Sequence, residues 1–179
     1  MKVLHNLQDD AEALIEESGL ITLLETFGKV SVQGSYRYRL MTIPDIDIYV
    51  IGPETGRSHA KALLSTLIDQ GFWNAFMFGD WVHFDREEFP SGYYIGLKRT
   101  FRCRRWKVDI WDLVEEPAGN SEFAERMSHL EDEEREAILN IKRWRDAEGY
   151  RIGSKQIYDA VLSGQAKDLL SFKRLIALE

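Results

Sequence analysis

The chain has 179 residues, and 23 Lys plus Arg stand against 30 Asp plus Glu, which gives a formal net charge of −7. This acidic balance disfavours general nucleic-acid binding, and a content of 44% hydrophobic and 12% aromatic residues excludes a disordered protein. A lone cysteine, Cys103, excludes both an internal disulfide and a zinc site built from cysteines. Nothing resembles a signal peptide, and no apolar run approaches the ~20 residues that span a bilayer. We therefore expect a cytoplasmic protein with no membrane partner.

The first third of the chain reads as helix followed by strand. Apolar residues at helical spacing predict a helix that Asp9 can cap, and this pattern breaks at Gly19 before it resumes. Gly28 ends it. Alternating valines then predict a strand over 29–33, and a second strand is expected over 45–51, which is β-branched and apolar apart from two carboxylates.

The middle of the chain changes from helical to alternating periodicity. An apolar stripe predicts a helix over 59–70, with Ser58 as its cap. Alternation then predicts a strand near 76–84 and two further strands over 93–100 and 104–114. We expect these last two strands to pair as a hairpin.

After the break at 117–120 the apolar residues return to helical spacing. The order of helix, strands, helix, strands and helices predicts an α+β fold, in which a mixed β-sheet is flanked by helices. We expect a sheet-bearing domain over 1–116. A C-terminal helical subdomain over 117–179 is expected to pack on it.

Two carboxylates interrupt the apolar strand over 45–51. Asp45 and Asp47 are two residues apart, so they project from the same face of the strand. Neighbouring carboxylates repel one another and resist burial unless a divalent cation lies between them, and Mg²⁺ prefers such oxygen ligands. Asp109 interrupts the strand over 104–114 in the same way. If the two strands are neighbours, the three carboxylates can hold two Mg²⁺ ions for an in-line phosphoryl displacement.

The alternative for Asp45 and Asp47 is an edge strand whose acids simply face water. Asp112 competes with Asp109 as the third carboxylate, but it lies three residues further on and so faces the opposite side of the strand. We therefore expect Asp112 to be a strand-end or turn residue.

Groups suited to phosphate binding lie beside these carboxylates in the sequence. Gly34 allows the backbone to approach a phosphate closely, and Ser35 offers a hydroxyl and an amide. Basic side chains near the Gly-Ser pair, or on the strand face of the third carboxylate, can neutralise phosphate charge. These nucleotide-binding candidates are Arg37, Arg39, Arg105 and Lys107.

The combined pattern is Gly34-Ser35, nine residues, Asp45 and Asp47 on a strand, and a later lone Asp109. It resembles the polymerase-beta-type nucleotidyltransferase superfamily, in the form of a small, minimal-type member. The resemblance implies a mixed sheet of the nucleotidyltransferase type and two Mg²⁺ ions. It also implies transfer of a nucleoside monophosphate, with AMP as the expected group, from a nucleoside triphosphate to an acceptor hydroxyl, with release of pyrophosphate.

The resemblance also implies a role for each matching residue. Gly34 and Ser35 hold the triphosphate, the first two carboxylates bind both metals, and Asp109 binds the catalytic metal and helps to activate the acceptor hydroxyl. Residues 1–116 become the nucleotidyltransferase domain. Many members carry a further Gly four or five residues after the Gly-Ser pair, but 36–40 contains none, so the phosphate contacts of the arginines stay open.

The acceptor and the activity itself have alternatives. A small-molecule hydroxyl fits the short, acidic chain better than a protein hydroxyl or an RNA end. The alternative function is a catalytically quiet binding or regulatory module, an antitoxin-like partner of a helical protein. A metal-dependent glycosyltransferase would also explain the two strand aspartates, but it gives the Gly-Ser pair no role.

Overall fold

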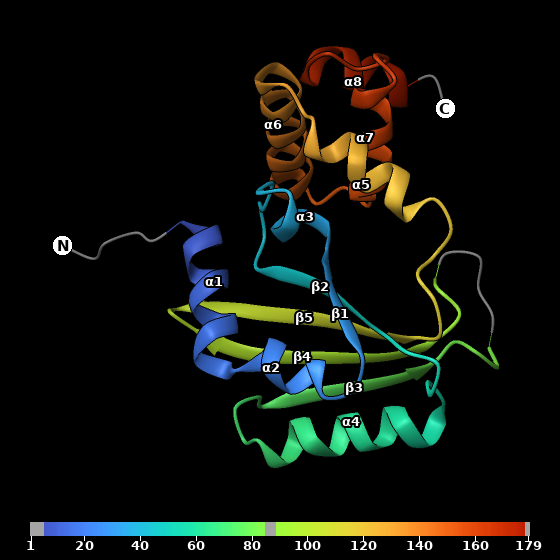
Figure 1. The fold of residues 1–179 in the computed structure, drawn as a ribbon. Coiled ribbons are helices and arrows are strands. Elements are labelled where there is room, and N and C mark those ends of the chain that lie inside the picture. Colours follow the sequence, from blue (N-terminus) through green and yellow to red (C-terminus); the bar gives the residue numbers. More distant parts are fainter. Residues whose placement is uncertain (1–5, 85–88, 178–179) are drawn as a thin grey trace. The chain divides into compact units, whose positions relative to one another are not determined.

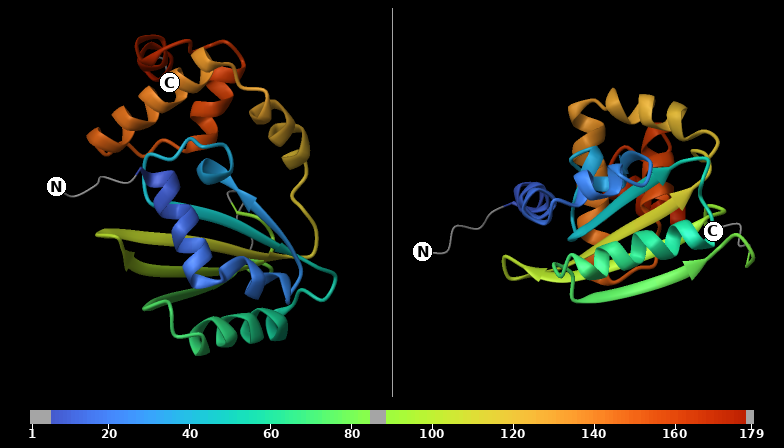
Figure 2. Two further views of the ribbon diagram at one scale, coloured as in Figure 1. Left: turned by 60° about the vertical axis from the view of Figure 1, so that its left-hand side comes forward. Right: turned by 60° about the horizontal axis from the view of Figure 1, so that its bottom comes forward.

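The structure is a computed structural model that describes residues 6–84 and 89–177. It divides into two compact units, which are treated separately below. The first comprises the residues up to Arg39 together with Pro44–Asn120, and the second comprises Leu40–Ile43 and the residues from Ser121 onward. Figures 1 and 2 show the helices and strands of both units.

The first unit is a five-stranded sheet with helices (Figure 1). The sheet has the order β1-β2-β5-β4-β3, in which β2 and β5 are parallel and the other neighbours are antiparallel. The predicted α+β class with a mixed sheet is therefore confirmed, and so is the hairpin of β4 and β5. The elements are α1 (Leu7–Ser18), α2 (Leu20–Glu25), β1 (Lys29–Gln33), α3 (Gly34–Arg37), β2 (Asp45–Ile51), α4 (Arg57–Asp69), β3 (Ala75–Asp80), β4 (Tyr93–Phe101) and β5 (Arg104–Leu113).

The two faces of this sheet differ in chemistry. On β2 the alternate residues Ile46, Ile48 and Val50 are fully buried, and they belong to the core face. The register partners of Ile46 and Ile48 on β5 are buried apolar residues as well, whereas Val50 lies opposite the buried Asp112. Helices α1, α2 and α4 add fully buried leucines to the core, namely Leu14, Leu20, Leu24, Leu63 and Leu67. The opposite face carries acidic and basic side chains together with aromatic rings.

Two of the predicted helix caps are wrong. Asn6 caps α1, because its side-chain oxygen accepts a hydrogen bond of 2.8 Å from the amide of Asp9, which is itself inside the helix. Helix α4 begins one residue before Ser58, after an extended Gly56. The predicted break at Gly19 is confirmed, since this glycine has φ +60° and ends α1.

Asp112 occupies the core face of β5, opposite to the face of Asp109, as predicted. It is fully buried. Its two carboxylate oxygens accept hydrogen bonds from the Thr55 hydroxyl at 3.0 Å and from Nδ1 of His59 at 2.9 Å. The other ring nitrogen of His59 lies 3.0 Å from the carbonyl oxygen of Phe27. Because the buried Asp112 has hydrogen-bond partners for both oxygens, its role is structural.

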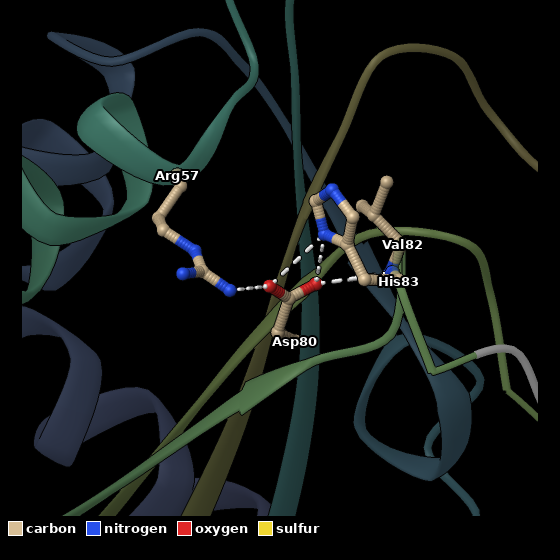
Figure 3. Close-up of polar contacts among 4 residues, drawn as sticks. All are labelled: Arg57, Asp80, Val82 and His83. Carbon is tan, nitrogen blue, oxygen red and sulfur yellow. Dashed lines mark hydrogen bonds and ion pairs between the residues drawn. The ribbon is translucent and has the colours of Figure 1, made fainter.

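A second polar cluster joins the start of α4 to the end of β3 (Figure 3). The Asp80 carboxylate accepts a hydrogen bond from Arg57 at 2.5 Å and lies 3.1 Å from Nδ1 of His83. The backbone amides of Val82 and His83 also donate to it. The hydrogen bond from Arg57, followed by those from His83, lowers the pKa of Asp80 to about 2.

Replacing Arg57 by Ala is expected to raise the pKa of Asp80 from about 2 toward its ordinary value of 3.8, because the largest cause of the shift is removed. A lowered pKa in the folded state stabilises the fold above the ordinary value, and this contribution disappears as the pH falls through about 2. The variant should therefore lose less stability on acidification across this window. Carboxyl NMR titration measures the shift, and Lys61→Ala, on the same helix, is the control. An unchanged Asp80 titration in the Arg57 variant contradicts the assignment.

The second unit is helical, as the periodicity predicts. Its helices are α5 (Asn120–Ser128), whose first residue lies in the first unit, α6 (Asp132–Glu148), α7 (Ser154–Leu162) and α8 (Leu169–Ile176). Lys142 on α6 is buried, and its ammonium donates to the carbonyl oxygen of Leu40 at 2.7 Å and to the hydroxyl of Tyr158 at 3.2 Å. These bonds tie the Leu40–Ile43 segment to the helices. Across the described parts of the chain, no helix has the length and apolarity to traverse a bilayer.

Candidate active site

Three carboxylates gather on the polar face of the sheet. Asp45 and Asp47 come from β2 and Asp109 from β5, and one ligand atom of each lies within 4.8 Å of the others. The cause is the parallel register, which sets Asp47 directly opposite Asp109. The condition stated from the sequence, that these strands are neighbours, is therefore met. The role of the three residues as metal ligands remains a proposal.

Gly34 fits closely against one of these carboxylates. It follows β1 directly and has φ +63°, a conformation that side chains other than glycine rarely adopt. A Cβ atom at Gly34 would overlap Oδ2 of Asp47 and would lie 3.2 Å from its Cγ. Glycine is thus required both for the backbone turn and for the space that the Asp47 carboxylate fills. Ser35 follows in α3, a four-residue helix that the sequence did not predict.

Lys107 is the predicted nucleotide-binding residue that lies among the carboxylates. Its Nζ atom is 2.5 Å from Oδ2 of Asp109 and 3.9 Å from Oδ1 of Asp45. Partial burial lowers the pKa of Lys107, but the hydrogen bond to Asp109 and the charges of Asp45 and Asp47 together outweigh it and raise the pKa above its ordinary value. The ammonium therefore stays charged beside the acids.

The three predicted arginines lie at different places around this face. Arg39 has φ +57° and forms an exposed ion pair of 3.4 Å with Glu12 of α1. Arg37 ends α3, with its guanidinium 5.6 Å from the ring centre of Tyr38. Arg105 is exposed on β5, two residues before Lys107. Their contacts with a nucleotide stay predictions.

Tyr94 contacts the site, which the sequence does not predict. Its hydroxyl donates a hydrogen bond of 2.7 Å to Oδ1 of Asp109. Burial, followed by the hydrogen bond to Asp109, raises the pKa of Tyr94 well above its ordinary value, so the hydroxyl keeps its proton. Gly96 lies opposite Asp109 in the register, and a Cβ atom there would be 2.5 Å from the Tyr94 hydroxyl oxygen. The absent side chain at Gly96 gives Tyr94 its path to the carboxylate.

If the site transfers nucleotides, as the sequence pattern predicts, Tyr94→Phe is expected to lower the transfer rate about tenfold. The lost hydrogen bond fixes the orientation of Asp109, and a bond of this kind contributes roughly 1–1.5 kcal/mol, which corresponds to about one decade in rate. Initial rates of pyrophosphate release measure the effect. Tyr93→Phe is the matched control, because Tyr93 is equally buried but lies on the core face of the same strand. Equal rates for Tyr94→Phe and the unmodified protein would refute a positioning role.

An aromatic cluster borders the carboxylates on the same face. Tyr94 and Trp111 are 8% exposed and their ring centres are 5.2 Å apart, and the partly buried Tyr49 and Trp81 pack against them. Trp111 is two residues beyond Asp109 on β5, and Tyr49 is two residues beyond Asp47 on β2. The cluster therefore places aromatic rings beside the carboxylates on this face of the sheet.

Comparisons with known proteins show what this fold is similar to. No protein-family model matches the chain, and no curated protein sequence matches it. Among solved structures, the fold is similar to a chain of the poly(A) polymerase complex GLD-2–GLD-3, with a TM-score of 0.51 and 14% identity. The match covers 84% of this chain and 53% of that one, so this chain spans about half the length of its structural neighbour. At this level of identity the likeness shows that the two chains share a fold.

Proposed function

We propose that this protein is a Mg²⁺-dependent nucleotidyltransferase. It transfers a nucleoside monophosphate, which we expect to be AMP, from a nucleoside triphosphate to an acceptor hydroxyl and releases pyrophosphate. The observation that carries the proposal is the convergence of three carboxylates from two neighbouring strands, with their ligand atoms within 4.8 Å of one another. The fold of nucleotidyltransferase type, which is shared with a poly(A) polymerase complex, supports the same reaction class.

The donor set fits the ions that this reaction uses. Asp45, Asp47 and Asp109 offer only carboxylate oxygens, which Mg²⁺ prefers, and they lie close enough together to share ions. These residues would hold two Mg²⁺ ions, and Asp109 would bind the catalytic one. When bound, such ions neutralise the phosphate charge and favour deprotonation of the attacking hydroxyl.

The remaining groups of the site bind the triphosphate, orient Asp109 and accept a proton. Gly34 and Ser35 hold the triphosphate, and Lys107 with the three arginines neutralises its charge. The acceptor oxygen attacks the α-phosphorus, and the bond from this phosphorus to the oxygen bridging to the β-phosphorus breaks. Pyrophosphate leaves with that oxygen, while Asp109 accepts the proton of the acceptor hydroxyl. Tyr94 donates to Oδ1 of Asp109 and so fixes the direction in which this carboxylate faces.

The acceptor is proposed to be a small molecule, in keeping with the short and acidic chain, and the compartment to be the cytoplasm. The test incubates the protein with Mg²⁺, candidate hydroxyl acceptors and each nucleoside triphosphate, labelled either at the α- or at the γ-phosphate. The proposal predicts that the α-label joins the acceptor and that the γ-label leaves in pyrophosphate. Transfer of the γ-label would instead indicate a kinase. Pyrophosphate release that persists in Asp45→Asn would place the chemistry elsewhere.

A further inference from the structure

Lys107 lies where opposite charges are brought together by the strand register. It is directly opposite Asp45 on the neighbouring parallel strand and two residues before Asp109 on its own strand. Its ammonium contacts Oδ2 of Asp109 at 2.5 Å and approaches Oδ1 of Asp45 at 3.9 Å. The strand register thus places the lysine beside both acids, within reach of its flexible side chain.

The oxygen atoms that Lys107 contacts are those a metal ion needs. Tyr94 donates to Oδ1 of Asp109, which leaves Oδ2 of Asp109 as the oxygen directed toward Lys107. Three carboxylates within 4.8 Å repel one another, and a nearby positive charge is required to hold them together. The Lys107 ammonium and a divalent cation would both supply this charge by binding the same carboxylate oxygens of Asp109 and Asp45. Only one of the two can therefore occupy these oxygens at a time.

We propose that Lys107 is an internal counter-cation, which holds Asp109 and Asp45 together before metal binds and which a divalent cation displaces. This inference rests on the proposed function, because it concerns the same carboxylates. The Lys107 side chain is 42% exposed, whereas that of Asp109 is 14% exposed. The flexible lysine stem therefore has water available on its open side, and the displaced ammonium moves outward while the carboxylates stay in place.

The main test measures Mn²⁺ binding to the full chain by electron paramagnetic resonance of the free ion. Lys107→Met is expected to tighten Mn²⁺ binding about two- to fivefold, the size of one partly exposed ion pair. Lys98→Met is the matched control, since Lys98 is the exposed cross-strand partner of Lys107 on β4 and carries the same charge. It is expected to change Mn²⁺ affinity less than twofold. Asp45→Asn should weaken binding strongly in either background.

The outcomes separate the two proposals. Displacement of Lys107 by the metal is wrong if the unmodified protein binds Mn²⁺ and Lys107→Met binds it no more tightly. It is also wrong if Lys107→Met and Lys98→Met tighten Mn²⁺ binding equally. In both cases the proposed metal site is still supported. If neither the unmodified protein nor Lys107→Met binds Mn²⁺, both proposals are wrong.

A second measurement needs no variant. Labelling of lysine amines by an acylating reagent, read by mass spectrometry, should rise several-fold at Lys107 when Mg²⁺ is added, while labelling at Lys98 stays constant. Unchanged or reduced labelling at Lys107 would overturn the displacement.

Discussion

Asp109→Asn is expected to reduce nucleotide transfer by at least about 10³-fold, while the protein stays folded. The substitution keeps the size of the side chain but removes the charge that a metal requires and the oxygen that would take the acceptor proton. Because three carboxylates lie within 4.8 Å of one another, removal of one charge also relieves repulsion. The free energy of unfolding should therefore be unchanged or higher. Initial rates and urea unfolding measure the two effects.

The matched control for this prediction lies on the same strand. Asp112→Asn changes an aspartate that is fully buried on the opposite face, where Thr55 and His59 bond to it. We expect this variant to lose roughly 2–4 kcal/mol of stability, because it disturbs the hydrogen bonds of a fully buried side chain. Below its melting temperature it should keep its rate within a few fold. If Asp109→Asn and Asp112→Asn lost activity alike, the loss would reflect the fold and not the chemistry.

Gly34→Ala is the second prediction with a large expected effect. The new Cβ atom would overlap the Asp47 carboxylate. The alanine backbone would also have to adopt φ +63°. Asp47 must then move, and a displacement of about 1 Å at a reacting site lowers rates roughly 10²-fold. We expect such a loss of transfer activity together with weaker Mn²⁺ binding. Rates and Mn²⁺ titrations on the purified variant measure both effects.

Gly19 offers a control for the backbone alone. It has φ +60°, close to that of Gly34, but a Cβ atom there would meet no atom of the described residues within 4 Å. Gly19→Ala therefore carries the same conformational cost, roughly 1–2 kcal/mol of stability, without any contact to a carboxylate. Its activity should stay near that of the unmodified protein. A comparable loss of activity in Gly19→Ala would show that backbone strain, and not contact with Asp47, explains the Gly34 variant.

The sequence predicts four of the strands and the polar face well, because local patterns determine both, whereas β3 ends at Asp80 and not near residue 84 as predicted. The two aspartates of β2 interrupt buried residues with a period of two, and this alternation fixes the face on which they lie. The same argument separates Asp109 from Asp112. The pairing of β2 with β5 is different, since it depends on contacts between residues about 60 positions apart in the chain. From the sequence this pairing was a condition, and only the structure shows that it is met.

The contacts around Asp109 could not be predicted for a similar reason. The hydrogen bond from Tyr94 requires the register of β4 on β5, and it also requires an unobstructed path over Gly96. The sequence does contain a tyrosine two residues before a glycine on the same strand. This pattern indicates a contact with a carboxylate only when the residue opposite the glycine is known. The sequence predicts phosphate binding for Lys107 because this residue shares the face of Asp109, but it does not predict the direct contact with that carboxylate.

The most direct test of the central claim is a crystal structure with Mn²⁺ and a non-hydrolysable ATP analogue. The anomalous scattering of manganese locates the metal independently of any model. The account predicts metal bound jointly by Asp45, Asp47 and Asp109, with the triphosphate against Gly34 and Ser35. Manganese bound away from these carboxylates, or a triphosphate seated elsewhere on the molecule, would contradict it.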